Sequence, residues 1–324
     1  MDIDRAVVQH IRAEERQKVL ADFGLAQAKP LAIGTEAEVY ELDGATLLKL
    51  YANISRLPHF QTLHKLYNTV DISASSLTLP KIYTIASYEN LIAIVETRLS
   101  GEPLESLLPY LQGEQLERVE ALYLDAVWQL KEVKVTEAPT TYLLFDEVGM
   151  SDTSQQSFAA FYAGFLEQKV AKVGRFFQSS TPSFIEKTAD LVQTIRSGKS
   201  APLCLVHGDF FPGNLLVDKH VTRVEGMIDF GSFTLFGNYL LDVAGAFGFY
   251  KMYDPQRRQN RARMMPQILA RLAAAEKPRF FQFLLANAIL TSDLYATTPD
   301  PRGDDHFQWA AEIVSNDSYW DAAL

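Results

Sequence analysis

The 324-residue sequence predicts an α+β protein, in which a small N-terminal antiparallel sheet precedes a larger, mainly helical C-terminal part. Two observations support this prediction. Between residues 28 and 98, short apolar runs alternate with turn residues, a pattern typical of a hairpin-rich sheet. After residue 98, long stretches with helical periodicity dominate, and only a few short apolar runs interrupt them. A chain of this length suits about two such units.

The first unit is expected to begin with a helix. Apolar side chains recur at helical spacing over residues 3–23, and Gly24 is a plausible stop. The runs LAIGTEAEVYEL and TLLKLY predict two strands, because Asp43-Gly44 between them is a strong hairpin signal. The remaining elements expected in this unit are a helix over about 57–69 and two strands that turn at Glu89-Asn90.

The segment RLSGEP predicts a hinge at residues 98–103, because it places Gly101 and Pro103 in a polar context. The helices expected beyond it cover about 113–134, 154–178, 182–197, 239–251, 256–275, 278–296 and 303–315. The short apolar runs expected between them are 203–207, 214–217 and 224–230. The division that follows is an N-terminal helix over 1–27, a strand-rich lobe over 28–98 and a helical lobe over 99–324.

Composition and charge argue against several classes of protein. The net charge is −10 and no basic stripe is present, which disfavours nucleic acid as a partner. The single cysteine, Cys204, cannot form an internal disulfide. The N-terminus lacks the apolar core of a signal peptide, and no run of about 18 apolar residues is present to span a membrane. We expect a soluble cytoplasmic protein that binds neither nucleic acid nor a membrane, and its oligomeric state is left open.

The stretch LVHGDFFPGNLLV, residues 205–217, places a histidine, an acid and an amide between two apolar runs. Asn214 follows Asp209 by five residues, and Asp229 ends the next apolar run, GMIDFGS, fifteen residues after Asn214. Neighbouring strands would bring Asn214 and Asp229 to one edge, where their oxygens can hold a hard cation such as Mg²⁺. Asp209 can accept a proton from an attacking hydroxyl. A loop aspartate usually serves a turn, but the two motifs in this order favour phosphoryl transfer.

HGDFFPGN followed by IDFG resembles the aminoglycoside phosphotransferase and choline kinase superfamily, the small-molecule branch of the kinase fold. The glycine of His-Gly-Asp, where protein kinases usually carry arginine, favours this branch. The resemblance covers about residues 28–255 and is strongest over 205–231. It implies a bilobal protein-kinase-like fold with ATP bound between the lobes.

Position by position, the resemblance implies that Asp209 is the catalytic base and that Asn214 and Asp229 are ligands of Mg²⁺. His207 is expected to brace the catalytic loop, a role close to that of an ordinary buried histidine. Asp242 in GNYLLDVAG is expected to hold the same loop, and capping of its own helix is an equally weighted alternative.

By the resemblance, Lys49 in TLLKLY matches the strand lysine that contacts nucleotide phosphates. A functional role is also favoured because an unpaired ammonium inside an apolar strand is costly to bury. The alternative is a lysine on the solvent face of the strand. The other residues expected around ATP are Gly34 in the loop over the phosphates, and Glu96 and Arg98 through their backbone. Ile33, Val39 and Leu216 are expected to line the pocket of the base, with ordinary core positions as the alternative. The loop over the phosphates has one glycine and matches G-x-G-x-x-G poorly.

The helix LPHFQTLHKLYNTV departs from the family pattern, because it contains no glutamate to pair with Lys49. Gln61 or His64 occupies the region where relatives would show one. Gln61 as a neutral partner, or Glu36 or Glu38 as an acid from elsewhere, are the candidates. This departure motivates an alternative function, a nucleotide-binding pseudokinase without turnover.

Only ten residues separate Gly231 from Asp242, and they hold neither a phosphosite segment nor A-P-E. A protein substrate is therefore disfavoured, and the expected partner is a small-molecule hydroxyl acceptor of aminoglycoside, amino alcohol or sugar type. Asp304 and Asp305, with Trp309 beside them, are candidates for contacting a cationic acceptor. The preferred alternative is a solvated loop in which one of the two acids caps the next helix.

Overall fold

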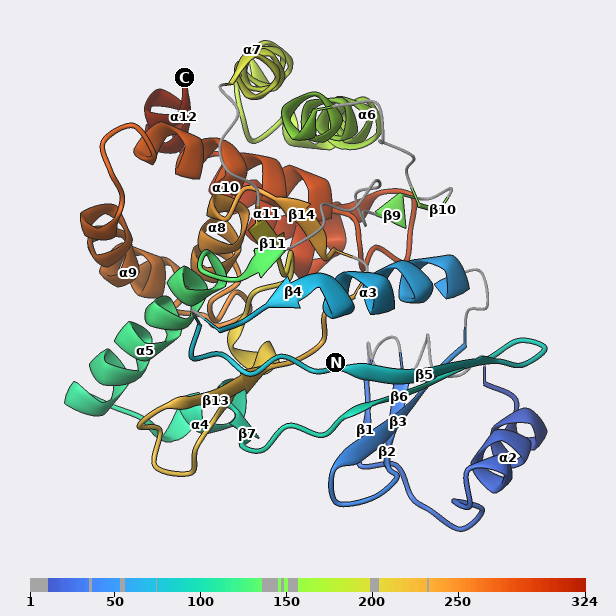
Figure 1. Ribbon diagram of the computed structural model, residues 1–324. Helices are drawn as coiled ribbons and strands as arrows, with labels where there is room; N and C mark the ends of the chain where they lie inside the picture. The colour runs from blue at the N-terminus through green and yellow to red at the C-terminus, as the bar shows by residue number, and fades with distance from the viewer. Residues whose placement is uncertain are drawn as a thin grey trace.

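The computed structural model describes residues 11–324, except 35–36, 53–55, 74, 136–144, 147–148, 151–156, 199–203 and 232. Within this part, an antiparallel five-stranded sheet precedes a largely helical region (Figure 1). The predicted α+β fold is confirmed. The segment of the expected N-terminal helix before residue 11 lies outside the described residues, and its remainder is α2 (Ala13–Asp22).

The sheet has the strand order β1-β2-β3-β6-β5. Its strands are β1 (Ala32–Ile33), β2 (Ala37–Glu41), β3 (Thr46–Tyr51), β5 (Ile82–Ser87) and β6 (Ile92–Thr97). Asp43 stabilises the predicted turn between β2 and β3, because its carboxylate accepts hydrogen bonds from the N–H groups of Ala45 and Thr46 at 2.7 and 2.8 Å. The second predicted turn, at Glu89-Asn90, joins β5 to β6.

Each face of the sheet packs against its own helix. Successive side chains of a strand point to opposite faces, and both faces of this sheet carry apolar side chains. Tyr40, Leu48 and Leu50 form one small core with Val19 and Leu20 of α2. The opposite face carries Tyr51, Ile92 and Ile94, which pack with Phe60 and Leu63 of α3 (Leu57–Thr69) as part of the larger core. Figure 1 shows α3 between the sheet and the helical region.

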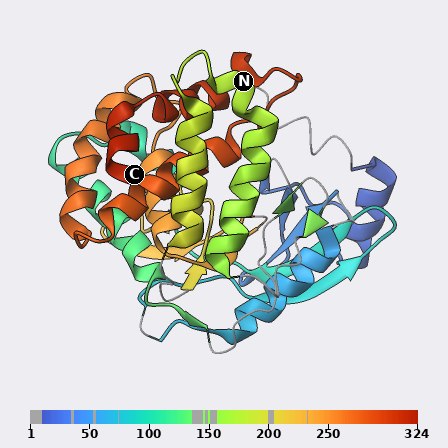
Figure 2. The same ribbon diagram turned by 90° about the horizontal axis from the view of Figure 1, so that it is seen from above.

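The helical region contains every helix that the sequence predicts there. The matching elements are α5 (Glu114–Leu130), α6 (Phe158–Phe177), α7 (Phe184–Ser197), α8 (Leu240–Gly248), α9 (Arg257–Arg271), α10 (Lys277–Thr291) and α11 (Asp305–Val314). Two further helices, α4 (Leu104–Leu107) and α12 (Asp317–Ala323), complete the described set. The core helix α10 packs against α6, α8, α11 and α12, and α6 lies beside α7 (Figure 2). Among the described residues, no helix is long and apolar enough to cross a membrane.

Short strands connect these helices. They are β4 (Val70–Asp71), β7 (Glu102–Pro103), β8 (Lys134–Val135), β9 (Phe145–Asp146), β10 (Gly149–Met150), β11 (Cys204–Val206), β12 (Leu215–Val217), β13 (Val224–Met227) and β14 (Leu235–Gly237). Three of them, in the order β13-β12-β7, form a small antiparallel sheet, and β11 pairs with β14. The sequence did not indicate β14.

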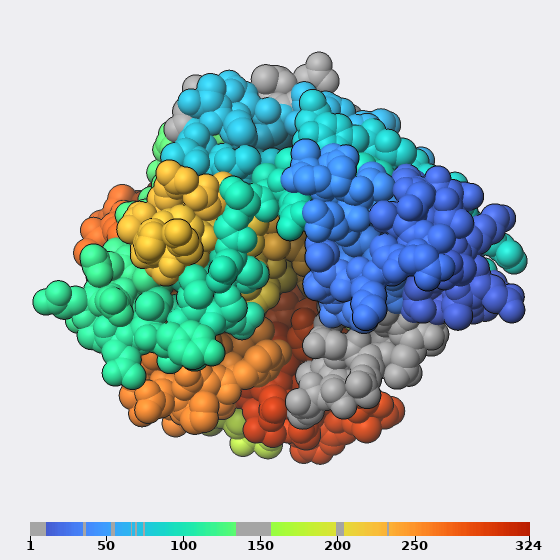
Figure 3. Space-filling view, turned by 90° about the horizontal axis from the view of Figure 1, so that it is seen from below, coloured from blue at the N-terminus to red at the C-terminus, as the bar shows by residue number. Residues whose placement is uncertain are grey.

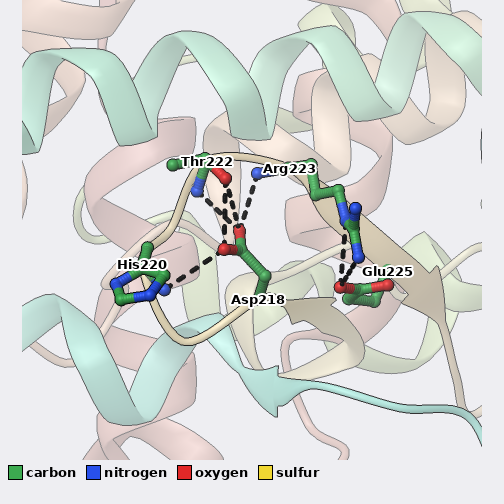
Figure 4. A network of polar contacts seen from close by, with 5 residues as sticks. All are labelled: Asp218, His220, Thr222, Arg223 and Glu225. Carbon is green, nitrogen blue, oxygen red and sulfur yellow. Dashed lines mark hydrogen bonds and ion pairs between the residues drawn. The ribbon is translucent and has the colours of Figure 1, made fainter.

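The turn between β12 and β13 is fastened by Asp218 (Figure 4). Its carboxylate accepts hydrogen bonds from the backbone N–H groups of Arg223, Thr222 and His220, and from the Thr222 hydroxyl. These hydrogen bonds, led by that of Arg223, lower the pKa of Asp218 to about 2. The closed end of the hairpin is therefore fixed, and the pairing of Leu215 with Met227 sets the relative position of the residues at its open end.

Candidate active site

The open end of the β12–β13 hairpin brings two predicted site residues together. Leu215 pairs with Met227 in the antiparallel register, and the N–H of Ile228 donates to the carbonyl oxygen of Asn214 at 2.9 Å. Asn214 and Asp229 each lie one or two residues beyond this pair. The two strands are thus side by side, as the spacing of the motifs indicates.

The loop before β12 is held by Asp242, which lies in α8. Its two carboxylate oxygens accept hydrogen bonds from the backbone N–H groups of His207 and Gly208, each at 2.8 Å. Complete burial raises the pKa of Asp242 to about 7, although these two hydrogen bonds act in the opposite direction. The side chain of Asp242 therefore binds the loop that carries Asp209 instead of capping its own helix.

His207 joins the loop to the second motif. Its Nε2 lies 2.8 Å from the carbonyl oxygen of Ile228, and its Nδ1 accepts the N–H of Asp209 at 3.2 Å. These two contacts require a neutral ring with its proton on Nε2. Burial lowers the pKa of His207 to about 4, which is consistent with that state. The ring also packs on Phe230, with 4.4 Å between the ring centroids.

The glycine of His-Gly-Asp has a steric cause. Gly208 has a φ of +82°, and a Cβ added there would lie 2.1 Å from the carbonyl oxygen of Phe233. An arginine at this position would collide with that backbone. The sequence feature that distinguishes this chain from protein kinases therefore reflects the close approach of the segment after Asp229.

Two supporting residues were not anticipated from the sequence. The hydroxyl of Thr234, fully buried, donates to the carbonyl oxygen of His207 at 3.1 Å and accepts the N–H of Gly231 at 3.0 Å. Tyr123 of α5 is also fully buried, and its hydroxyl lies 3.2 Å from the carbonyl oxygen of Phe210. For Thr234, the available signal was a hydroxyl residue inside the apolar run SFTLF.

The oxygens at this site suit Mg²⁺. Asn214 Nδ2 donates to the backbone carbonyl of Asp209 at 2.9 Å, so Oδ1 is the atom left for a cation. Asp229 has a φ of +65° and a side chain that is 62% exposed. Among the described residues, no group of three or more His, Cys, Asp or Glu side chains can hold a metal. Mg²⁺ needs no such group, because it is commonly bound by one or two side chains together with water and phosphate oxygens.

Lys49 faces this site from the N-terminal sheet. Its Nζ lies 2.9 Å from Glu96 Oε1 and 3.5 Å from Asp229 Oδ1. The side chains of Lys49 and Glu96 are each only 9% exposed, so a place on the solvent face is ruled out for Lys49. Burial alone would lower the pKa of Lys49, but the opposite charge of Glu96 leads the effects that raise it well above its usual value.

The strand register contradicts the prediction that Glu38 pairs with Lys49. Lys49 pairs with Val39, whereas Glu38 is opposite Leu50 and its side chain points to the other face. There Glu38 accepts hydrogen bonds from Arg16 and Tyr40. Gln61 is exposed, and Glu36 lies outside the described residues.

Some of the remaining residues expected around ATP lie on the same side of the sheet as Lys49, and others do not. Val39 shares the face of Lys49, and Leu216 is buried in β12. Ile33 is opposite Glu38, on the face away from Lys49, so its side chain is removed from the expected pocket. Gly34 directly follows β1, and its N–H donates to the carbonyl oxygen of Ala37 at 2.9 Å.

The backbone at the end of β6 is already hydrogen bonded within the protein. The N–H of Arg98 donates to the carbonyl oxygen of Ala45 at 2.8 Å, and that of Thr97 donates to Lys81 at 3.0 Å. The Arg98 side chain forms a surface ion pair with Glu41. The donors expected to meet the base are therefore not free at these two positions, and the side chain of Glu96 is engaged with Lys49.

The C-terminal residues predicted to contact an acceptor separate into two groups. Trp309 is 1% exposed, and its Nε1 donates to the carbonyl oxygen of Gly248 at 2.8 Å. The prediction that Trp309 contacts the acceptor is wrong, because its side chain belongs to the core. Asp304 caps α11 by accepting the N–H of His306 at 2.9 Å, which is the preferred alternative, while Asp305 is exposed.

The capped segment contacts Tyr253, which lies between α8 and α9. Tyr253, half-exposed, shares a hydrogen bond of 2.9 Å with His306 Nδ1. The pKa of Tyr253 is raised by burial, then by Tyr295, and further by the charges of Asp304, Asp305 and Asp209. The charges of the two C-terminal acids and of Asp209, the expected catalytic base, therefore all act on the phenol of Tyr253. Figure 3 shows a hollow between the blue surface of the N-terminal sheet and the green, orange and red surfaces of the helical region.

The chain belongs to the phosphotransferase enzyme family APH, whose profile matches residues 27–280. No curated protein sequence matches it. The fold is that of aminoglycoside kinases. APH(3'')-Id from Streptomyces rimosus, solved with ADP and streptomycin, is 16% identical with a TM-score of 0.54, over 84% of this chain and 96% of that one.

Two further solved structures match over nearly their whole length. Wild-type aminoglycoside 2'-phosphotransferase-IIIa, solved as a GDP complex, is 11% identical with a TM-score of 0.60, over 96% of this chain and 99% of that one. The streptomycin–ATP complex of APH(2'')-IIa is 15% identical with a TM-score of 0.52, over 94% and 98%. At these identities the matches establish the fold alone.

Proposed function

We propose that the protein is an ATP- and Mg²⁺-dependent phosphotransferase that moves the γ-phosphoryl group to a hydroxyl of a small molecule. The observation that carries this proposal is the convergence of four side chains from both parts of the chain. Lys49 reaches Asp229 at 3.5 Å, and Asn214 Nδ2 lies 3.5 Å from Asp209 Oδ2. Family membership and the nucleotides named in the related complexes support the same activity.

The residues divide the reaction among them. Asp209 accepts the proton of the acceptor hydroxyl, whose oxygen forms the new bond to the γ-phosphorus while the bond to the β,γ-bridging oxygen breaks and ADP leaves. Asn214 and Asp229 are the residues that would hold Mg²⁺, which neutralises phosphate charge when bound. Lys49 contributes a second fixed positive charge. Positioning and charge stabilisation account for most of such a rate enhancement.

The acceptor is proposed to carry an amine as well as a hydroxyl. Tyr253 is hydrogen bonded to His306 of α11, and the charges of Asp304, Asp305 and Asp209 all act on its phenol. Carboxylates beside an aromatic ring favour a cation. The segment from Gly231 to α8 is occupied by β14, which leaves no extended activation segment for a protein substrate. The pseudokinase alternative loses its motive as well, because Glu96 supplies the acid that α3 lacks.

The test is acceptor-dependent ADP release by the purified protein with Mg²⁺ and ATP, and in parallel with GTP. The acceptor panel contains aminoglycosides, amino alcohols and sugars, and the Asp229→Ala variant is the control. Release that depends on one acceptor class and is lost in the variant is the expected result. ATP binding without transfer to any acceptor would favour the regulatory alternative, and a phosphorylated protein band would point to a protein kinase.

A further inference from the structure

The lysine of the N-terminal sheet has its acid partner in the sheet itself. We infer that Glu96 is the positioning residue of Lys49 and takes the place of the acid that α3 lacks, so that the sheet alone fixes Lys49. This inference rests on the proposed function, because it assigns Lys49 to the nucleotide phosphates. It adds a residue for which the sequence offered only a backbone role.

The geometry of the pair follows from the strand register. Lys49 of β3 is opposite Ile94, and Glu96 of β6 is opposite Leu47, so the two side chains are diagonal neighbours on one face. Diagonal neighbours across a ladder are within reach of long side chains. The resulting separation is 2.9 Å between Lys49 Nζ and Glu96 Oε1, with both side chains 9% exposed. A backbone ladder runs directly between the two residues, so no movement of a helix is needed to form the pair.

Two other acids in the described part of the sheet have partners of their own. Glu38 is on the opposite face with Arg16, and Glu41 pairs with Arg98 at the surface. Asp229 also approaches Lys49, but at 3.5 Å and from a largely exposed side chain. Glu96 is therefore the buried carboxylate that neutralises Lys49, because a buried ammonium without a partner would be costly.

The arrangement of two acids around one lysine has a chemical consequence. Glu96 neutralises Lys49, and Asp229 is thereby left available to a metal. If Glu96 loses its charge, Asp229 becomes the nearest carboxylate to Lys49, and the lysine then competes with Mg²⁺ for it. Removing the Glu96 charge should weaken metal-dependent nucleotide binding as well as the direct contact of Lys49 with phosphate.

Helix α3 has a different task in this arrangement. Its Tyr67 packs edge-on against Phe230, with 5.7 Å between the ring centroids, and its hydroxyl lies within the electrostatic influence of Glu96 and Lys49. The helix thus contacts the Asp-Phe-Gly segment through an aromatic ring and offers Lys49 no carboxylate. This division explains how the site tolerates a helix without glutamate.

The test compares Glu96→Gln with Glu38→Gln. Both substitutions remove the charge of a buried, ion-paired glutamate from the same sheet, on opposite faces. The readouts are the Kd of ATP by calorimetry without any acceptor, the Mg²⁺ concentration for half-maximal ATP binding, and the unfolding midpoint. We expect Glu96→Gln to raise the Kd and the Mg²⁺ requirement by about tenfold or more, the scale for residues that orient a ligand. Glu38→Gln should lower the unfolding midpoint and leave both binding values unchanged.

Glu96→Asp keeps the charge on a shorter side chain and should recover part of the lost affinity. Equal Kd values and equal Mg²⁺ requirements for Glu96→Gln and the unsubstituted protein would overturn the inference. So would the same loss in Glu38→Gln, since that would indicate a general weakening of the sheet.

A protein that binds no ATP at all would instead contradict the proposed function. The pair itself is then tested by unfolding, with Lys49→Met and Glu96→Gln alone and together. Non-additive shifts of the unfolding midpoint are expected, because either single change leaves a buried charge unpaired. Additive shifts would refute the assignment of Glu96 to Lys49 independently of any nucleotide.

Discussion

The hydroxyl of Thr234 donates a hydrogen bond to the carbonyl oxygen of His207 at 3.1 Å, deep in the core beneath the candidate active site. The same hydroxyl accepts the N–H of Gly231 at 3.0 Å. A residue that belongs to neither motif therefore connects the loop carrying Asp209 with the segment carrying Asp229. The distance between Asp209 and Asp229 depends on this connection.

Thr234→Val is expected to separate the two motifs with almost no change in volume. The variant leaves the Gly231 N–H without its acceptor, which should lower the free energy of unfolding by about 1–3 kcal/mol. Because small misplacements at an active site are costly, kcat should fall about tenfold or more. Denaturant unfolding and steady-state kinetics measure both. Thr188→Val is the control, since Thr188 is equally buried but donates only to carbonyls of its own helix. An equal loss of kcat in both variants would contradict the prediction.

Gly208→Ala should disable the catalytic loop. The added Cβ would meet the Phe233 carbonyl oxygen at 2.1 Å, and the φ of +82° is unfavourable for alanine. We expect a loss of more than about 3 kcal/mol in the free energy of unfolding, together with loss of activity. Gly164→Ala is the control, because Gly164 has no neighbour within 4 Å of an added Cβ and lies inside α6. Helix propensity should stabilise that variant by about 0.5–1 kcal/mol. Thermal unfolding of both proteins distinguishes the two outcomes.

Asp209→Asn should lower kcat by about 10²-fold or more, the scale of a lost general base. The KM for ATP should change little, since Asp209 is assigned to the acceptor hydroxyl. Asp190→Asn, at an exposed position of α7, provides a control of the same chemistry. Turnover of Asp209→Asn near that of the control would remove Asp209 from the role of base.

The contribution of His207 to stability should fall as the solution becomes acidic. Its pKa is about 4 in the folded protein, against about 6.5 for an ordinary histidine. Between these values the unfolded chain binds a proton that the folded protein does not, so stability is present above about pH 6.5 and is lost as the pH falls toward 4. A shift of this size corresponds to roughly 3 kcal/mol.

The measurement is denaturant unfolding from pH 7.5 to 4.5 for the unsubstituted protein, His207→Gln and His220→Gln. The first variant should show a shallower loss of stability with falling pH. His220, on the exposed β12–β13 turn, should leave the slope unchanged. Identical slopes in all three proteins would show that His207 does not contribute.

Local signals in the sequence were sufficient for much of the fold. The hairpin at Asp43-Gly44 and the helix over 57–69 follow from turn chemistry and periodicity, and α3 has those bounds. The proximity of Asn214 and Asp229 was also predictable, because Asn214 precedes one short strand and Asp229 follows the next strand along the chain.

The pairing of charges was not predictable in the same way. Which face of β2 a glutamate occupies depends on its register with β3, and a shift by one residue reverses the face. Glu38 was thus a reasonable candidate for Lys49, yet it points away, while Glu96 reaches Lys49 from the strand on the other side. The prediction for Trp309 was wrong for a related reason. Helical periodicity does not say which aromatic side chains face a cleft and which ones face the core.

The small core between α2 and the sheet extends beyond the region that matches the family. The part of the chain needed for folding is therefore longer than the part that the family shares. The family match begins at residue 27, but Val19 and Leu20 are buried against Tyr40, and Arg16 neutralises the buried Glu38. A chain shortened to start at residue 27 would expose that apolar face and leave Glu38 without its cation, a defect worth several kcal/mol. A fragment cut where the family resemblance starts would therefore be expected to aggregate, although it retains every residue assigned to catalysis.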